Sequence, residues 1–258
     1  MPPPFSEDHV GELSVPPNQD LCGRRYYIYV DDGYTPRHKD STPPPPPPPP
    51  VKKANPGPLG LLGFGMTTVL LNVHNTGFYP LTTAVVGMGL CYGGLVQLIA
   101  GLFEFVRGNT FGYVAFCSYG AFWMSLVCTW MFQNNAFVEG HPVNPTDAYF
   151  LGVYLLMWGI FTFFMFINTL RTNLALMTVF GSLMVLFVLL AAGNMGHSPV
   201  TLRVAGFEGI FCGASALYLA FAEVTNEVYG RELLPVGSID LFLDRGKKKA
   251  EGNKLAQV

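Results

Sequence analysis

A row of polar side chains lies inside an apolar stretch in the first third of the chain. Phe64, Thr68, Asn72 and Asn75 follow one another at intervals of four, four and three residues, so a helix would place them on one face. Thr and Asn in an apolar medium need hydrogen-bond partners or water. A polar stripe broken by one aromatic ring is typical of the wall of a narrow pore. Hydrogen bonding between packed helices is the alternative, and the spacing leaves both interpretations open.

A second group of residues that could bind a ligand stands just before this row. The run Asn55-Pro56-Gly57-Pro58 has the composition of a helix start, with a capping residue followed by two prolines. A helix amino end carries a partial positive charge and free N–H groups, so it attracts a carboxylate. Asn55 and Pro56 are therefore candidate substrate-binding residues, although a well-capped helix start would explain the same pattern.

The elements that position these residues must lie in a membrane, because the chain is too poor in charge for a water-facing surface. Of 258 residues, 50% are hydrophobic and 12% are charged, and the mean hydropathy is +0.33. Soluble domains carry about 25% charged residues. Between Ala54 and Gly230 the basic residues are Arg107, Arg171 and Arg203 alone. The folded region has no basic stripe, so we expect no nucleic-acid partner.

Six apolar segments of about 20 residues are each long enough to cross the hydrocarbon core of a bilayer as a helix. They cover residues 57–75, 80–104, 112–133, 148–170, 174–193 and 202–224. Six crossings put both chain ends on one side of the bilayer. That side receives Lys52 and Lys53, Arg107, Arg171 and Arg231, whereas Arg203 falls on the other. By the positive-inside rule, we predict that both termini are cytoplasmic.

Composition divides the chain into three parts. Residues 1–54 are predicted to form a disordered, proline-rich cytoplasmic tail, and its run from Pro43 to Pro50 is either a solvated spacer or a ligand for a proline-binding domain. Residues 55–230 are predicted to form a six-helix transmembrane domain, and residues 231–258 a basic cytoplasmic tail. The cysteines lack paired metal spacing, and HExxH, GxSxG and P-loop motifs are absent, so we expect no metal, no cofactor and no enzyme.

Several runs of the chain resemble the acetate uptake transporter family. They are the segment from Asn55 to Pro80, QLIAGLFEFVRGNTFGYVAFCSYGAFW at 97–123, FLGVYLLMWGIFTFFMF at 150–166, LFVLLAAGN at 186–194, and residues 210–220. The family usually has Ala where this chain has Gly57, which softens the helix start but leaves Asn55 and both prolines in place. The resemblance implies a homohexameric ring of all-α protomers in the lipid bilayer, each with its own six-helix pore.

The resemblance also implies a narrow apolar constriction, which by local match falls on Phe64, Tyr119 and Leu183. Gln97 and Trp123 are further matching positions. The candidate substrate-binding residues are thus Asn55, Pro56, Thr68, Asn72, Asn75, Gln97 and Trp123.

Glu104 matches the family as well and stands three residues before Arg107. A local i,i+3 ion pair would explain this spacing. A role for Glu104 in proton or substrate access is the second interpretation.

An apolar constriction decides in which form an acid crosses it. Protonating a carboxylate with a pKa of about 4.3 at pH 7 costs about 3.7 kcal/mol. Removing water from the anion costs several kcal/mol in a real protein, and about 20 kcal/mol in the ideal Born limit. We therefore predict transport of small monocarboxylates, acetate first and succinate as a further candidate, together with protons across the plasma membrane. The alternative is a passive channel for a small neutral solute such as undissociated acid, urea or ammonia.

Overall fold

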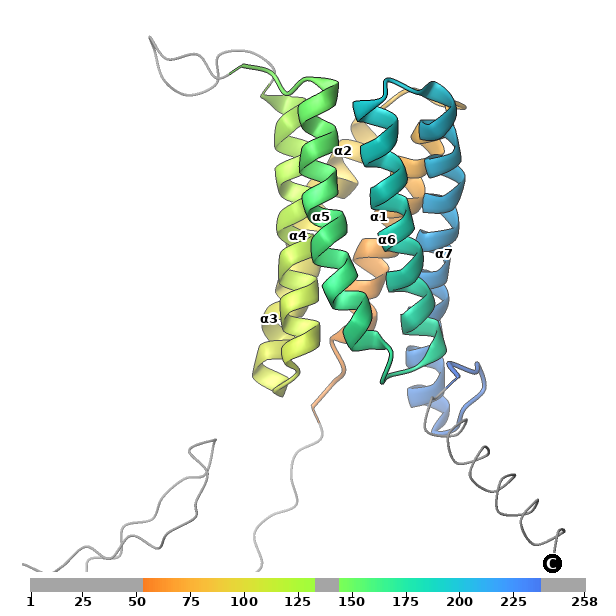
Figure 1. Ribbon diagram of the computed structural model, residues 1–258. Helices are drawn as coiled ribbons and strands as arrows, with labels where there is room; N and C mark the ends of the chain where they lie inside the picture. The colour runs from red at the N-terminus through yellow and green to blue at the C-terminus, as the bar shows by residue number, and fades with distance from the viewer. Residues whose placement is uncertain (1–52, 133–143, 238–258) are drawn as a thin grey trace, which may run out of the picture. The chain divides into compact units, whose positions relative to one another are not determined.

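A computed structural model describes residues 53–132 and 144–237, and the regular elements in these ranges are helical (Figure 1). They are α1 (Gly57–Asn75), α2 (Thr83–Leu90), α3 (Gln97–Arg107), α4 (Thr110–Met131), α5 (Ala148–Thr169), α6 (Leu174–Met195) and α7 (Pro199–Tyr229). A π-helical turn, η1 (Cys91–Val96), joins α2 and α3 into one rod. The proline run and the basic cluster of the carboxyl tail lie outside the described residues, so their roles stay predictions.

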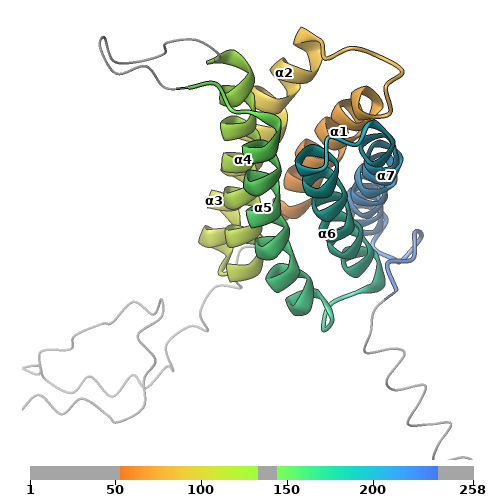
Figure 2. The same cartoon turned by 45° about the horizontal axis from the view of Figure 1, so that its top comes forward.

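Within the described residues, five rods are long and apolar enough to cross a membrane, which confirms the predicted class of all-α integral membrane protein, while the sixth predicted crossing stays a prediction. They are Thr83–Arg107, Thr110–Met131, Ala148–Thr169, Leu174–Met195 and Pro199–Tyr229. The 19-residue α1 is not among them, because its glycine, threonine and asparagine residues lower its hydropathy. Eleven of its residues are buried. Figures 1 and 2 show α1 running through the bundle, between the α2–α3 rod and the pair formed by α6 and α7.

Glycines let α1 and α7 approach each other closely. A Cβ built on Gly209 would lie 2.0 Å from Cγ of Asn72, and one on Gly213 would lie 2.7 Å from the carbonyl oxygen of Gly65. Neither position has room for a larger residue. Small residues thus allow close packing of this pair, which makes the most extensive helix–helix contact in the described chain.

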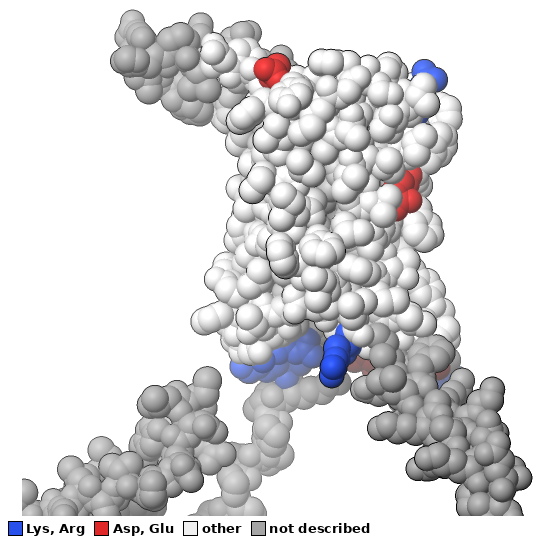
Figure 3. Space-filling view, viewed as in Figure 1, with Lys and Arg blue, Asp and Glu red and all other residues white. Residues whose placement is uncertain are grey.

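The basic side chains mark the two ends of the bundle. Lys53 precedes α1, Arg107 ends α3, Arg171 follows α5 and Arg231 follows α7, and these points share one end because the rods alternate in direction. Arg203 lies in the first turns of α7, at the other end. In Figure 3 blue groups accordingly gather along the lower edge, with one at the upper edge. The bundle thus has the charge asymmetry that the sequence predicts.

The last helix is longer than its apolar segment. The hydroxyl of Ser198 accepts a hydrogen bond from the Thr201 N–H at 3.3 Å, and Pro199 occupies the first turn. The helix ends at Gly230, which has the left-handed conformation that glycine adopts readily (φ 64°). The helix therefore extends five residues beyond the apolar segment 202–224, and Glu223 lies within it.

Candidate functional site

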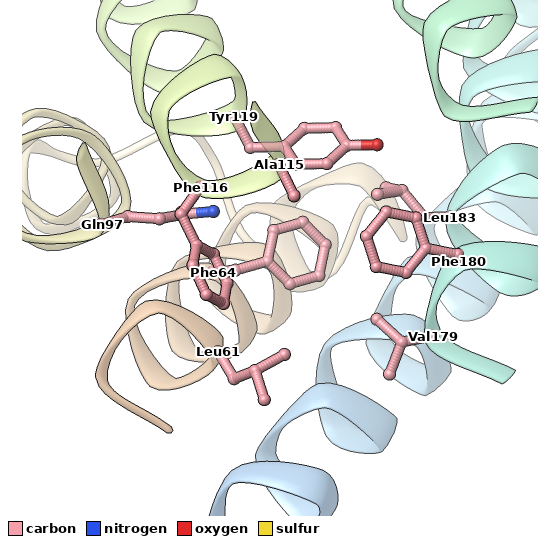
Figure 4. A pocket seen from close by; sticks show the side chains of 9 residues that line it. All are labelled: Leu61, Phe64, Gln97, Ala115, Phe116, Tyr119, Val179, Phe180 and Leu183. Atoms are coloured by element: carbon pink, nitrogen blue, oxygen red, sulfur yellow. The ribbon is translucent and has the colours of Figure 1, made fainter. Parts of the chain in front are cut away.

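Phe64 of α1, Tyr119 of α4 and Leu183 of α6 meet around one small cavity (Figure 4). Each is at most 5% exposed. The cavity holds about 20 Å³, which is room for about one water molecule. Its other lining residues are Leu61, Gln97, Ala115, Phe116, Val179 and Phe180. We call this cavity and its lining the waist. The three residues assigned to a constriction by family likeness are thus brought together, inside the bundle and away from lipid.

The hydroxyl of Tyr119 is directed away from the cavity by its hydrogen bond. It lies 2.9 Å from the hydroxyl of Thr162, and the Thr162 hydroxyl in turn donates to the carbonyl oxygen of Trp158 at 2.7 Å. Because Thr162 has a single hydroxyl hydrogen, Tyr119 must be the donor in the first bond. The ring of Tyr119 packs against Phe64 and Phe180, with 6.1 Å between centroids in both pairs. Tyr119 therefore contributes apolar surface to the waist, and its hydroxyl hydrogen is already donated to Thr162.

Three buried polar atoms in the described chain have no hydrogen-bond partner: Thr68 Oγ1, Gln97 Oε1 and Trp123 Nε1. All three residues are at most 2% exposed. An unsatisfied buried polar group costs about 1–3 kcal/mol. All three residues belong to the predicted substrate-binding set. Their hydrogen-bonding capacity is available to a small polar solute inside the bundle.

Two of these atoms lie one helical turn beyond the waist. Thr68 follows Phe64 by four residues, and Trp123 follows Tyr119 by four. Since α1 and α4 run in the same direction (Figure 1), both displacements are toward the same end of the bundle. Gln97 lines the waist itself. The unpaired groups therefore extend from the waist toward the end at which α1 and α4 finish.

The π-helical turn η1 determines the position of Gln97, which is the first residue after it. A Cβ on Gly93 would lie 2.8 Å from Thr67 Oγ1, and one on Gly63 would lie 2.7 Å from the carbonyl oxygen of Tyr92. The wide turn and the glycines allow α1 to press against this rod, with Gln97 beside it. Sequence patterns do not reveal this turn, although π-helical turns often mark functional sites.

Asn72 and Asn75 continue the polar face of α1, but both are hydrogen-bonded within it. Asn72 Nδ2 donates to the carbonyl oxygen of Thr68 at 2.8 Å, and Asn75 Nδ2 donates to Asn72 Oδ1 at 2.9 Å. Asn72 is packed against Gly209 of α7, whereas Asn75 lines a second cavity described below. The polar row thus contributes to helix packing at Asn72 and to the lining of a cavity at Asn75, while Thr68 is buried between Asn72 and the waist.

A larger cavity of about 230 Å³ adjoins the waist at the end where α1 begins. Its lining includes Asn55, Gly57, Glu104, Arg107, Asn109 and Glu223, and it shares Leu61, Ala115, Phe116 and Phe180 with the waist. We call it the Glu104 vestibule. The shared lining makes the two cavities neighbours along one path.

Asn55 connects three elements at this vestibule. Its Oδ1 accepts from the Gly57 N–H at 3.1 Å, and its Nδ2 donates to Glu223 Oε2 at 2.9 Å. Arg107 also donates to Asn55 Oδ1. Asn55 therefore caps α1 from the residue before Pro56, which is the N-cap itself and is half-buried. The first free amide of α1 is already satisfied, so the helix amino end is less open to a carboxylate than the sequence suggests.

Glu104 makes the local ion pair considered from the sequence and also lies beside a cavity. Its Oε1 lies 3.9 Å from Arg107, which is the local ion pair, and its Oε2 accepts from Asn109 Nδ2 at 2.8 Å. Glu104 is 1% exposed and also lines the vestibule. A fully buried carboxylate with one cation and one amide on the path is a candidate for controlling access.

Sequence reasoning missed Glu223, because it stands where the apolar run of α7 gives way to polar residues. A usable signal was present: Gly209, Cys212, Ala216 and Leu219 form a small, buried face of α7 at helical spacing, and Glu223 continues that face. The half-buried Glu223 is therefore turned toward α1 and the vestibule rather than toward lipid.

A third cavity of about 220 Å³ lies at the opposite end of the bundle. Its polar lining residues are His74, Asn75, Trp130 and Asn194; the others are Leu71, Leu81, Leu126, Leu151, Leu155, Leu190 and Leu202. We call it the Asn194 vestibule. Its lining contains no carboxylate, lysine or arginine from the described chain.

Comparison with known proteins agrees with this arrangement. Residues 39–235 match the model of the GPR1/FUN34/yaaH family. The chain is 50% identical over 186 residues to the succinate-acetate/proton symporter SatP of Escherichia coli (strain K12), covering 72% of this chain and 96% of that protein. It is 36% identical over 181 residues to the ammonia transport outward protein 2 of Saccharomyces cerevisiae, covering 68% and 63% of the two chains.

The fold is also similar to the solved structure of the bacterial acetate channel SatP. That comparison has a TM-score of 0.68 at 50% sequence identity, and it covers 72% of this chain and all of the solved one. The likeness to acetate transporters that the sequence motifs indicate is thereby confirmed.

Proposed function

This chain belongs to the GPR1/FUN34/yaaH family, and from that premise we propose that it carries acetate and similar small monocarboxylates across a membrane together with protons. The observation that supports the proposal most directly is the waist, which has about 20 Å³ of space between apolar rings and Leu183. A solute that passes it must be small and must leave its water shell behind.

The waist favours the protonated acid over its anion. Protonation at pH 7 costs about 3.7 kcal/mol for an acid with a pKa of about 4.3. Dehydrating the anion costs several kcal/mol, unless donors replace the lost water. Phe64 and Leu183 have none, and the hydroxyl hydrogen of Tyr119 is used by Thr162. The side-chain amide of Gln97 is therefore the donor that the waist offers (Figure 4). The neutral acid, or the anion accompanied by a proton, is then the species that crosses.

The unpaired polar atoms beside the waist complement a protonated carboxyl group. Thr68 O–H and Trp123 N–H can donate to a carbonyl oxygen, whereas Gln97 Oε1 needs a donor. A carboxylic acid offers one acceptor and one O–H donor, but a carboxylate has no hydrogen to give. This pairing is the second support for a proton-bearing substrate.

The test is uptake of labelled acetate, propionate, lactate and succinate into proteoliposomes, with and without an imposed pH gradient. We expect acetate to accumulate above its external concentration when the outside is acidic, after subtraction of diffusion into protein-free vesicles. Equal flux at all external pH values, at fixed total acetate, would contradict proton coupling.

A passive channel for undissociated acid, urea or ammonia is the second candidate. It is supported by the names of two similar proteins, since one solved relative is called an acetate channel and one yeast relative an ammonia transport protein. A pore for urea would equilibrate it without accumulation, and a pore for ammonia would gather ammonium on the acidic side. A pore for undissociated acid would gather acetate on the alkaline side, as a symporter does. Urea and ammonia arms therefore identify a neutral-solute pore, and saturation of the acetate rate with concentration separates a carrier from a channel for the acid.

The proposal includes an arrangement in the membrane. With α1 as the sixth crossing, the basic residues at the end where the chain enters and leaves the bundle support cytoplasmic termini. The plasma membrane is the proposed location and a homohexamer the proposed assembly, with one pore in each protomer. Cysteine accessibility on intact cells tests the orientation, and the mass of the purified detergent complex tests the number of protomers.

A further inference from the structure

Oxygen atoms from three separate elements converge at the start of α1. A Cβ built on Gly57 would lie 3.1 Å from Asn55 Oδ1, 3.3 Å from Glu223 Oε2 and 3.4 Å from Glu104 Oε1. Both carboxylates therefore approach the same point, and both line the Glu104 vestibule. A larger residue at position 57 would crowd these oxygens, so glycine leaves the space between them open.

The two carboxylates have different partners. Glu104 is held by the Arg107 guanidinium and by the amide of Asn109. Glu223 accepts a hydrogen bond from the neutral amide of Asn55. Glu104 in the same vestibule and Glu227, one turn further along α7, both repel a negative charge on Glu223, whereas the Arg107 guanidinium favours one. Glu223 lacks the ion pair that Glu104 makes with Arg107. Of the two carboxylates, Glu223 is the one that is more readily protonated.

The vestibule is connected to the waist, which Gln97 lines with its side-chain amide nitrogen directed toward the cavity (Figure 4). Gln97 is 1% exposed and lines the waist, and the waist and vestibule share four lining residues. A protonated acid that leaves Gln97 toward this end therefore enters the cavity that contains Glu223.

We propose that Glu223 is the proton acceptor for the transported acid at this end of the pathway. This inference rests on the proposed function. The O–H bond of the acid breaks, its proton forms a new O–H bond on Glu223, and the acid becomes a carboxylate. Glu223 then gives the proton to vestibule water and returns to its starting state.

The transfer is favourable in two respects. Donor and acceptor are both carboxylic acids, so their ordinary pKa values are close and the exchange is nearly isoenergetic. The net charge of the vestibule also stays the same, because the new anion replaces the charge that Glu223 loses. Arg107, within the same lining, then faces a free carboxylate. Transport in the opposite direction reverses each step.

The experiment compares Glu223→Gln with Glu227→Gln in proteoliposomes, measuring both uptake driven by a pH gradient and acetate exchange at equal pH. Glu227 is an exposed residue one turn further along α7 that does not line the vestibule, so its substitution is the matched loss of charge. Glu223→Gln should lower gradient-driven uptake by about tenfold and flatten its pH profile, because vestibule water is a poorer base than a positioned carboxylate. Exchange of the protonated acid should fall much less.

Three further results decide the proposal. Glu223→Asp, which keeps the carboxylate, should retain the pH profile at a lower rate. A carbodiimide reacts with protonated carboxyl groups. In the unsubstituted protein with acetate present, it should modify Glu223 in preference to Glu104 and Glu227, as measured by peptide mass spectrometry. This measurement does not depend on whether Glu223→Gln folds. Wild-type coupling in folded Glu223→Gln, or labelling without preference for Glu223, would overturn the assignment while the proposed function stands. Absence of proton-driven uptake in the unsubstituted protein would contradict both the proposed function and the role of Glu223.

Discussion

The two vestibules have nearly the same volume, about 230 and 220 Å³, but different chemistry. The Glu104 vestibule contains two carboxylates and a guanidinium, whereas the polar groups of the Asn194 vestibule are amides, an imidazole and an indole. Because neither is narrow, we expect size selection to take place between them, at the waist. Their difference in charge indicates that the two ends treat the proton of an acid differently.

The waist also differs in how closely it adjoins the two vestibules. It shares four lining residues with the Glu104 vestibule and none with the Asn194 vestibule. On the Asn194 side, Phe122 packs edge-on against Phe187 at 5.3 Å and against Trp158 at 5.1 Å. An acid in the waist is thus in direct reach of the charged end, while an aromatic layer lies next to it on the uncharged side.

The largest expected effect comes from enlarging the waist without changing either vestibule. Leu183→Ala should raise the flux of butyrate relative to acetate by about 10- to 200-fold, because one or two methylenes are worth about 1–3 kcal/mol in a tight apolar pocket. The measurement is a set of straight-chain acids in proteoliposomes. Leu183 is 3% exposed, so its side chain cannot turn away to make room.

Leu190→Ala is the matched control for this change. Leu190 lies two turns along the same helix, is 9% exposed and lines the Asn194 vestibule. Both substitutions cost about 2–5 kcal/mol of stability, so lost packing alone would affect both proteins. If Leu190→Ala widens the range of acids as much as Leu183→Ala, selection is not confined to the waist.

The next expected effect concerns the polar atoms between the waist and the Asn194 vestibule. Thr68→Val removes a buried hydroxyl without a partner, so the protein should become more stable by about 1 kcal/mol. Acetate uptake should fall by about 2- to 10-fold, the value of one hydrogen bond to the solute. Chemical denaturation and proteoliposome flux measure the two quantities.

Thr67→Val serves as the comparison for Thr68→Val. Thr67 is equally buried, but its hydroxyl donates to the Met88 carbonyl oxygen at 3.4 Å. This variant should lose stability and keep its transport rate. A Thr68→Val protein with both lower stability and normal uptake would mean that Thr68 has a packing role alone.

A smaller effect is expected when the Asn194 vestibule is given a charge of its own. Asn194→Asp should lower acetate uptake at pH 7 by about two- to threefold, from the repulsion of one carboxylate in a hydrated cavity. The effect should disappear as the pH falls below the ordinary Asp pKa of about 3.9, where the new side chain is neutral. High salt should weaken it as well.

Asn168→Asp provides the control, because Asn168 makes the same kind of hydrogen bond, from Nδ2 to the carbonyl oxygen four residues before it, on an exposed face of α5. It lines neither vestibule. Equal loss of uptake in both variants would assign the effect to the broken hydrogen bond and would remove the role of charge from the comparison.

The sequence predicts these regions to different extents, for physical reasons. Spacing alone placed Phe64 and Thr68 on one face of a helix, because helical periodicity is local. The meeting of Phe64 with Tyr119 and Leu183 depends on three helices far apart in the chain, and family likeness supplied it.

Other features needed coordinates. The hydroxyl of Tyr119 is occupied by Thr162, 43 residues away, which no local pattern indicates. Glu223 lies inside the predicted segment 202–224, but its contact with Asn55, 168 residues away, leaves no local pattern, so it was missed. The π-helical turn before Gln97 has the composition of an ordinary apolar helix and leaves no sequence signal.

The smallest expected effect sharpens the comparison at the charged end. Gly57→Ala introduces the residue that is usual in the family, and its methyl group would lie 3.1–3.4 Å from the oxygens of Asn55, Glu223 and Glu104. These contacts are tight, but the three atoms are ends of side chains that can move by a few tenths of an ångström. The helix gains from the loss of glycine flexibility, so the free energy of unfolding should change by less than about 1 kcal/mol. Proton-driven uptake should fall by less than about threefold, because Glu223 keeps its carboxylate and shifts slightly from Asn55. A loss as large as that of Glu223→Gln would show that the spacing of these oxygens, and not the presence of a second carboxylate, distinguishes the Glu104 vestibule from its uncharged counterpart.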